Sequence, residues 1–399
     1  MRISFTGDVM CEPMLIEQSR KQSSTYDFSG VFKEVEKVFA KSDYVVANLE
    51  TPIAGEAFEL TRSLFSFNAP VEFIEGLESS GVSCVTIANN HSFDRGIEGA
   101  IRTVRVLEES DLEHVGMSIS GAEPKPLYKN VDGESFALLS YTYGVNQLPQ
   151  ECDVEGQDRV HIGLLRSQGD RQNPSSVPSR RSFLKRLLLR FTTKEQRIRF
   201  KKRLGLRYYS AYRDDTFDDQ AVKPFLERLS TDIKAAKEKA DVVVCCLHMG
   251  GQFNAEPGKF SEHVVEVSVR AGCDAVIASH PHVAQKAVVI DGKPIFYSLG
   301  NFSMFPDSVY VLHEHHPEYG LIAHLDMNDG AIRGVSFSII KMVVHNRKLE
   351  IWPIDVLYRT LEGAEDKELL ESEVAQIYER VTGHKLEDGI IRSEYTLLN

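Results

Sequence analysis

The first part of the chain alternates short apolar runs with segments of helical periodicity. Its strand-like runs lie at residues 3–6, 44–47, 84–88 and 137–141. Helical periodicity falls between them, at residues 31–39, 71–79 and 99–108. A second series follows, with helices at 220–239 and 261–271 and strands at 242–247 and 275–278. Strands that alternate with helices in this way predict a layered α/β fold.

The pattern changes in the last third of the chain, where strands are separated by turns and not by helices. The strand-like runs there are 287–290, 294–298, 321–325, 335–344 and 349–354. Asn328-Asp329-Gly330 and Asn346-Arg347-Lys348 are typical of hairpin turns, so these strands should pair antiparallel. Residues beyond Thr360 are acidic and have helical periodicity, and we predict a terminal helix on the outside of the fold.

Composition and charge place the chain among globular proteins and single out one stretch. Of its 399 residues, 42% are hydrophobic and 26% are charged, close to the average for soluble domains. The net charge is −12, yet the stretch 166–213 has 15 Lys/Arg against 2 Asp/Glu, which leaves 31 against 56 elsewhere. We predict a domain at 1–360 with a basic insertion at about 150–216, followed by an acidic helical extension at 361–399.

No targeting or membrane-spanning segment is visible in the sequence. The first ten residues lead directly into a strand, without the basic and long apolar regions of a signal peptide. No window approaches the ~18 uncharged apolar residues that a membrane-spanning helix needs. These features predict a cytoplasmic protein. Cys245 and Cys246 lie in the apolar run 242–247, which is typical of buried thiols and not of a disulfide framework.

Potential metal ligands follow directly after the apolar strands in five segments. These segments are Gly7-Asp8, Asn48-Leu49-Glu50, Asn89-Asn90-His91 with Asp94, His248, and His280-Pro281-His282. In α/β sheets, ligands bind at the carboxyl ends of the strands. Carboxylates, amide oxygens and imidazoles together suit Mn²⁺, Fe²⁺ or Zn²⁺, and a bridging carboxylate can hold two ions ~3.5–4 Å apart. The pattern therefore predicts a site for two divalent metal ions.

The same segments resemble a known family. In chain order they read Gly7-Asp8-Val9-Met10, Asn48-Leu49-Glu50, Ala88-Asn89-Asn90-His91-Ser92-Phe93-Asp94, His248-Met249-Gly250, His280-Pro281-His282 and Ser298-Leu299-Gly300-Asn301-Phe302. This set resembles the CapA family of poly-γ-glutamate capsule biosynthesis proteins, which are related to the calcineurin-like metallophosphoesterases. The resemblance implies an α/β, metallophosphoesterase-like fold in which two β-sheets pack as a sandwich flanked by helices, here with an inserted basic helical segment.

The resemblance also implies roles for single residues. Asp8 is similar to the first carboxylate ligand of the family, and Glu50 stands where related proteins have the carboxylate that bridges two ions. His91 resembles the catalytic histidine, and Asp94 resembles the acid that orients it. The remaining metal ligands that the resemblance implies are Asn90, His248, His280 and His282.

One departure from the wider superfamily affects the first metal position. Met10 stands where general metallophosphoesterases have a histidine, and a thioether is a poor ligand for hard dications. Glu12, two residues further on, could replace that histidine only if its loop turns back. We therefore expect the ion beside Asp8 to be held more weakly than the ion beside His248.

The function that these residues predict is that of a CapA-type dinuclear metal hydrolase in capsule or cell-envelope synthesis. Its substrate would be anionic, either a phosphoester or a polyglutamate-like polymer. A nucleotide or nucleic-acid phosphodiesterase is an alternative from the same site, and a non-catalytic, metal-containing capsule assembly protein is an alternative of another class.

Two further clusters stand apart from the ordered motifs. The basic segment 180–207 is either a helical lid with solvated Lys and Arg or a face for an anionic polymer or a membrane surface. Aromatic residues are sparse in it, so nucleic acid is the least favoured partner. His313-Glu314-His315-His316 has the composition of a metal site, but its position in a turn before Pro317 favours a solvated loop.

Overall fold

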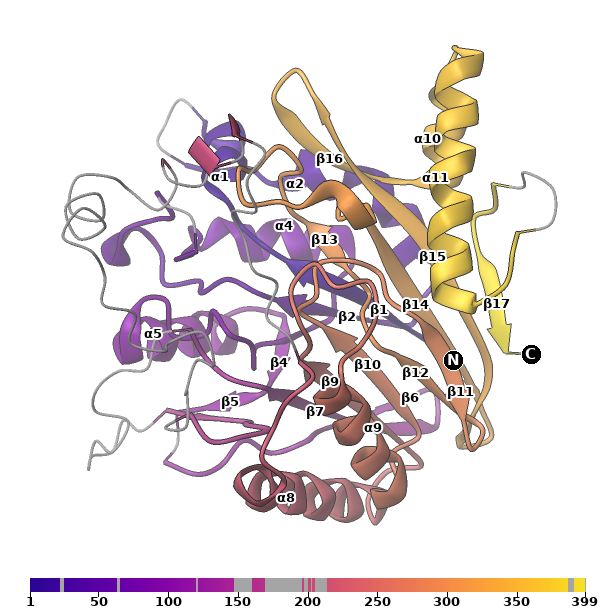
Figure 1. Cartoon of the computed structure of the whole chain (residues 1–399). Helices are drawn as coiled ribbons and strands as arrows, with labels where there is room; N and C mark the ends of the chain where they lie inside the picture. Colours follow the sequence, from indigo (N-terminus) through magenta and orange to yellow (C-terminus); the bar gives the residue numbers. More distant parts are fainter. Residues whose placement is uncertain are drawn as a thin grey trace.

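The computed structural model describes residues 1–21, 25–62, 65–119, 121–146, 160–168, 196, 200–201, 203–204, 214–386 and 391–398. Within these residues, two large β-sheets pack face to face and helices cover their outer faces (Figure 1). The predicted two-sheet α/β architecture is confirmed. No helix in the described part of the chain combines the length and the apolar character that crossing a bilayer requires.

The larger sheet has the order β16-β15-β14-β1-β2-β3-β4, with β13 beside β1 and β17 beside β15. Its strands are β1 (Arg2–Val9), β2 (Tyr44–Leu49), β3 (Cys84–Thr86), β4 (Glu113–Val115), β13 (Asn301–Ser303), β14 (Tyr319–Asn328), β15 (Ala331–His345), β16 (Lys348–Pro353) and β17 (Tyr395–Leu398). The strands from β1 to β4 are parallel, whereas β14, β15 and β16 are antiparallel to their neighbours. The predicted hairpin turns join these last three strands, as expected.

The smaller sheet has the order β11-β12-β10-β9-β7-β6. Its strands are β6 (Leu127–Val131), β7 (Glu134–Thr142), β9 (Val242–His248), β10 (Ala275–Ser279), β11 (Ala287–Ile290) and β12 (Lys293–Phe296). β7, β9, β10 and β12 are parallel, so their carboxyl ends lie at one edge of the sheet. A short separate pair is formed by β5 (Met117–Ser118) and β8 (His161–Ile162).

Alternation of side chains along the strands places one core between the sheets and one on each outer face. In β9, Val242, Val244 and Cys246 point into the core between the sheets, and Val243, Cys245 and Leu247 point towards the helices. This period-2 pattern is what a strand buried on both faces requires. Cys245 and Cys246 are free and buried, as predicted, one on each face of the strand.

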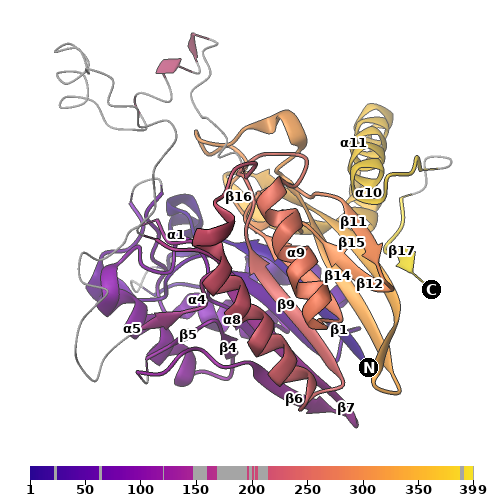
Figure 2. The same ribbon diagram turned by 60° about the horizontal axis from the view of Figure 1, so that its bottom comes forward.

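Helices cover the outer face of each sheet. The larger sheet carries α1 (Pro13–Ser19), α2 (Ser29–Phe32), α3 (Glu36–Phe39), α4 (Glu72–Ser80) and α5 (Gly96–Glu108). The smaller sheet carries α8 (Asp219–Lys237) and α9 (Lys259–Ala271), which lie side by side in Figure 2. The predicted helix 31–39 is instead α2 and α3 joined by a 3₁₀ turn at Lys33–Val35, and this winding buries Phe32, Val35 and Phe39 together.

The last residues of the chain complete the larger sheet. After α10 (Ile354–Thr360), α11 (Ala364–Thr382) buries Leu370, Val374, Ile377 and Val381 in the core that the two sheets share. The described residues after α11 include β17, which pairs with β15 and was not predicted. Its four residues are too few to give a period-2 signal, and only the pairing with β15 makes them a strand.

The predicted insertion is partly integrated into the fold. In the described stretch 160–168, β8 pairs with β5, and Leu165 is buried against the helix-covered face of the smaller sheet. Asp214 is buried as well and accepts a hydrogen bond from the backbone N–H of Ser261 in α9 (2.9 Å). The basic helices predicted at 180–207 lie outside the described residues, apart from residues 196, 200, 201, 203 and 204.

Candidate metal centre

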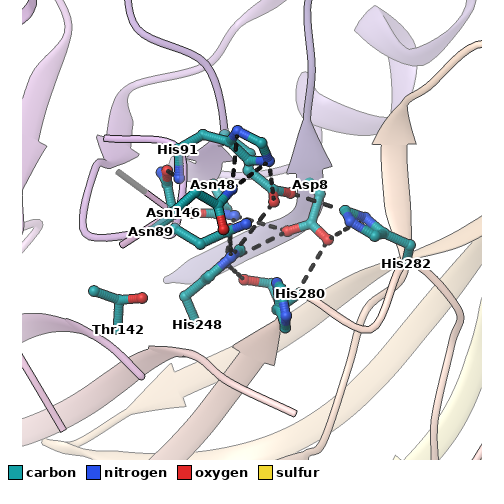
Figure 3. A network of polar contacts seen from close by, with 12 residues as sticks. Asp8, Asn48, Asn89, His91, Thr142, Asn146, His248, His280 and His282 are labelled. Atoms are coloured by element: carbon teal, nitrogen blue, oxygen red, sulfur yellow. Dashed lines mark hydrogen bonds and ion pairs between the residues drawn. The ribbon is translucent and has the colours of Figure 1, made fainter. Parts of the chain in front are cut away.

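The predicted ligands come together where the carboxyl ends of the parallel strands of both sheets meet (Figure 3). Asp8 lies near the end of β1, and Glu50 directly follows β2. His248 is the last residue of β9, and His280 directly follows β10. Because parallel strands end at the same edge of a sheet, side chains that are far apart in the sequence face one another.

The position of Asp8 depends on the glycine before it. A Cβ added to Gly7 would lie 2.0 Å from the backbone oxygen of Gly300, so no other residue fits there without moving the chain. This close approach lets β13 pair with the end of β1. There Asp8 stands opposite Asn301, and the Asp8 N–H donates to Gly300 O (3.0 Å).

His280 and His282 lie on a turn whose backbone angles residues other than glycine rarely adopt. His280 has φ 102° and His282 has φ 59°, and Pro281 stands between them. Positive φ at a residue other than glycine costs free energy, and such residues concentrate at functional sites. The turn is held by a hydrogen bond from the His280 N–H to Asp8 Oδ2 (3.1 Å) and by one from Asn301 Nδ2 to His282 O (2.9 Å).

Two groups of ligand atoms share one carboxylate. One group consists of Asp8, Glu50 and His282, and the other of Glu50, His248 and His280. In each group, one ligand atom from every residue lies within 4.8 Å of the others, and all the side chains are buried. Asn90 Oδ1 lies 2.6 Å from His248 Nε2 and therefore faces the second group. The structure thus brings together all six predicted ligands, with Glu50 common to both groups.

The donor set fits two divalent ions. Both carboxylate oxygens of Glu50 and both ring nitrogens of His280 are buried without a hydrogen-bond partner. Buried polar atoms are almost always hydrogen-bonded, because leaving them unpaired costs free energy. Metal ions coordinated by these atoms would remove that cost. Carboxylate, amide and imidazole groups together are ligands that divalent metal ions accept.

The pKa values of Glu50, His282 and Asp8 show how the protein accommodates two buried carboxyl groups when no metal ion is bound. Burial and the nearby Asp8 carboxylate raise the pKa of Glu50 to about 8. Burial opposes protonation of His282, but Glu50 and the hydrogen bond with Asp8 raise its pKa to about 9. Burial also acts to raise the pKa of Asp8, yet the hydrogen bond and charge of His282 bring it below its ordinary value. Protons therefore balance the buried carboxylates, and metal binding has to displace them.

The other two imidazoles are ready to act as ligands. Burial lowers the pKa of His248 to about 3, and burial together with the neighbouring imidazoles lowers that of His280. Both side chains are therefore neutral near pH 7, which is the form that binds metal.

His91 lies beside the ligand groups and belongs to neither. Its Nδ1 is 2.6 Å from Asp94 Oδ2, and the same oxygen accepts a hydrogen bond from the Phe67 N–H (2.7 Å). The Phe67 ring packs edge-on against the imidazole, with 4.6 Å between the ring centres. His91 Nε2 is left facing the centre, 3.9 Å from Glu50 Oε1. Asp94 is thus hydrogen-bonded to His91, and the catalytic role of the pair stays a prediction.

Glu12 does not turn back towards the metal centre. Its carboxylate is buried and accepts hydrogen bonds from Ser308 Oγ (2.7 Å), Tyr310 OH (2.7 Å) and the Phe305 N–H. Met10 is buried in the apolar core of the larger sheet. Neither residue joins the group of Asp8, Glu50 and His282, which consists of three candidate ligands.

Several supporting residues were not singled out as site residues from the sequence. Asn48 Nδ2 donates to Asp8 Oδ1 (2.7 Å) and lies 3.2 Å from His248 Nδ1. It therefore contacts one candidate ligand of each group. Asn301 Oδ1 lies 2.9 Å from His282 Nδ1. Both asparagines belong to motifs noted in the sequence: Asn48 lies near the end of β2, and Asn301 is the first residue of β13. Asn146, whose amide lies 3.4 Å from the His91 ring, follows no motif.

Comparisons with known proteins agree with this geometry. The chain is 25% identical over 302 residues to the PGA biosynthesis protein CapA of Bacillus subtilis (strain 168), with 75% of this chain and 62% of that protein covered. It is 24% identical over 306 residues to the capsule biosynthesis protein CapA of Bacillus anthracis, with 76% and 59% covered. This chain therefore spans about three fifths of the length of these relatives.

Among solved structures, TT1561 of Thermus thermophilus aligns over 88% of this chain and 98% of its own, at 9% identity and a TM-score of 0.36. That similarity is too low to carry an inference about fold. The family description "Bacterial capsule synthesis protein PGA_cap" matches residues 2–305, a range that includes every ligand candidate and His91. The resemblance seen in the motifs is thereby confirmed: the chain belongs to the bacterial capsule synthesis protein PGA_cap family.

Proposed function

We propose that this protein is a dinuclear metal-dependent hydrolase that acts on a phosphoester or an anionic polymer in capsule or cell-envelope synthesis. The observation that carries the proposal is Glu50. It belongs to both ligand groups, and neither of its buried oxygens has a hydrogen-bond partner. The relatives named for capsule biosynthesis support the link to an envelope polymer.

The candidate metal ligands form two sets, one for each ion. Asp8 and His282 would hold one ion, His248, His280 and Asn90 would hold the other, and Glu50 would join them. When bound, two divalent ions lower the pKa of water and polarise a phosphoryl or carbonyl oxygen. The hydrogen bonds from Asn48 to Asp8 and between His282 and Asn301 fix the ligand side chains before any ion arrives.

His91 is the candidate proton donor. Donation of the Nδ1–H of His91 to Asp94 leaves Nε2 facing the centre, so a second proton taken up from solvent on Nε2 would point towards the centre. From there it can pass to the oxygen or nitrogen of the leaving group, which is general acid catalysis. Asp94 itself touches no reacting atom and acts as a positioning residue.

A cation near the centre supports an anionic substrate. The Arg166 guanidinium lies 5.0 Å from the centre of the Tyr143 ring, and that ring lies 4.6 Å from the His280 ring. Arg166 is also close enough for its charge to contribute, after burial and the neighbouring imidazoles, to the lowered pKa of His280. A negative group bound beside His280 would gain from this charge.

The experiment is a turnover assay of the metal-loaded protein on an arylphosphate, a bis-arylphosphate and poly-γ-glutamate. The variant is His91→Ala, and its control is His345→Ala at the exposed end of β15. We expect His91→Ala to bind metal as the wild type does while turnover falls about 10²–10⁴-fold, less with a good leaving group. Bound metal with no turnover on any substrate would favour the assembly-protein alternative, and loss of metal would make His91 a ligand.

A further inference from the structure

A second group of metal-ligand side chains lies outside the part of the chain that matches the family. His316 and Glu318 stand in the loop before β14, and Glu373 lies on α11. One ligand atom from each lies within 4.8 Å of the other two. These three side chains are 18%, 17% and 16% exposed. In the cluster predicted to be a solvated loop, His313 and Glu314 are exposed, whereas His316 is packed beside α11.

The two imidazoles of the loop aim the same kind of atom at one carboxylate. His316 Nδ1 lies 3.5 Å from Glu318 Oε1, and His313 Nδ1 lies 3.9 Å from Glu318 Oε2. Glu318 Oε2 is buried and has no hydrogen-bond partner. An imidazole lone pair and a carboxylate oxygen repel each other unless a cation lies between them, so this arrangement requires a proton or a metal ion.

The surroundings of His316 resemble those of a metal-bound histidine. Its Nε2 lies 3.3 Å from Gln376 Oε1, so an Nε2–H can donate to that amide oxygen. Donation from Nε2 leaves the lone pair on Nδ1, the atom that faces Glu318. Histidine ligands in metal sites are commonly held in this way, with the second ring nitrogen bonded to an oxygen behind it.

The group contains two carboxylates, and one of them is paired with a lysine. Lys341 Nζ lies 2.7 Å from Glu373 Oε2, and Tyr319 OH donates to the same oxygen. Glu373 Oε1 accepts neither of these bonds and is therefore the oxygen available to an ion. With neutral imidazoles, Glu318, Glu373 and Lys341 leave one net negative charge, which an added dication converts to one net positive charge.

We propose that His316, Glu318 and Glu373 form a separate mononuclear site for Zn²⁺ that fastens α11 to the loop before β14. Two carboxylates and an imidazole suit this borderline ion, and water would complete its coordination. The same loop supports the first centre, because Pro317 O accepts a hydrogen bond from Asn301 Nδ2. This site does not depend on the proposed hydrolase activity.

The test measures Zn²⁺ bound to the full-length protein after metal removal, by calorimetry and metal analysis. The variants are His316→Ala and Glu373→Gln, and the matched control is His315→Ala, whose side chain belongs to neither group. We expect both variants to bind one Zn²⁺ fewer than the control, or to bind it at least tenfold more weakly, and to lose the rise in melting temperature that this ion produces. Circular dichroism checks that each variant is folded.

A Glu50→Gln background separates this site from the first centre. That substitution removes the shared ligand there, so the one tight Zn²⁺ that remains should disappear with His316→Ala. If both variants bind Zn²⁺ with the number and affinity of the His315→Ala control, the proposal is wrong and a proton alone holds the cluster. Failure of the hydrolase proposal would instead show as no turnover, with this Zn²⁺ site intact.

Discussion

Glu50→Gln should make the metal-free protein more stable while it abolishes metal binding. Glutamine has nearly the shape of a protonated glutamate but carries no charge. Glu50 is fully buried and stands next to Asp8, and its pKa rises from 4.5 to about 8 in the folded protein. The wild-type carboxyl must therefore stay protonated in the folded state at a pH where the unfolded chain releases that proton.

The size and sign of the effect follow from this pKa difference. A carboxyl whose pKa is raised by folding costs nothing below its unfolded pKa, and the cost grows as the pH rises from 4.5 to about 8. At pH 7, which is about 2.5 units above 4.5, the cost at about 1.36 kcal/mol per unit is about 3 kcal/mol. At pH 5 the same calculation leaves less than about 1 kcal/mol. Glutamine has no proton to release in this pH range, so the Glu50→Gln variant does not have this cost at any pH.

The assay is urea unfolding of wild type and Glu50→Gln in a chelator at pH 5 and pH 7, with Glu368→Gln on the exposed face of α11 as control. Stripped Glu50→Gln should be more stable than stripped wild type by about 3 kcal/mol at pH 7 and by far less at pH 5. Added Mn²⁺ should reverse the order, because two ions, each at 100 times its Kd, together stabilise the folded wild type by about 5 kcal/mol, which exceeds the gain of the variant. A variant that is less stable than wild type at pH 7 without metal, or that still binds two ions, would refute the reasoning.

Two other predictions concern the construction of the centre. Calorimetric titration of stripped protein should show two unequal sites, with the ion beside Asp8 held more weakly because its group lacks a counterpart to Asn90; two equally tight sites would mean that a further group completes the coordination. Gly7→Ala should destabilise the fold by about 3 kcal/mol or more and weaken metal binding, because its Cβ would meet Gly300 O at 2.0 Å. Gly30→Ala, which has free space around it, is the control, and equal melting temperatures for both variants would contradict the close approach.

The order of strands and helices, and the residues that gather at the strand ends, could be predicted from the sequence. Apolar runs with period 2 or 3.6 report on local structure, which depends on neighbours a few residues apart. The ligands Asp8, Glu50 and His248 were identifiable because each ends an apolar strand, and the parallel strands of an α/β sheet all end at one edge. The ordered motifs then supported the family, which the match over residues 2–305 confirms.

The tertiary structure alone decided features that depend on residues far apart in the chain. β17 is a strand only because β15 offers it an edge, and Glu12 turns away from the centre because Phe305, Ser308 and Tyr310 bind its carboxylate. The cluster around His316 is part of the packed fold only because α11 brings Glu373 to it from residues further along the chain. No local pattern contains such contacts, since hydrogen bonding and burial act through space and depend on how the whole chain packs.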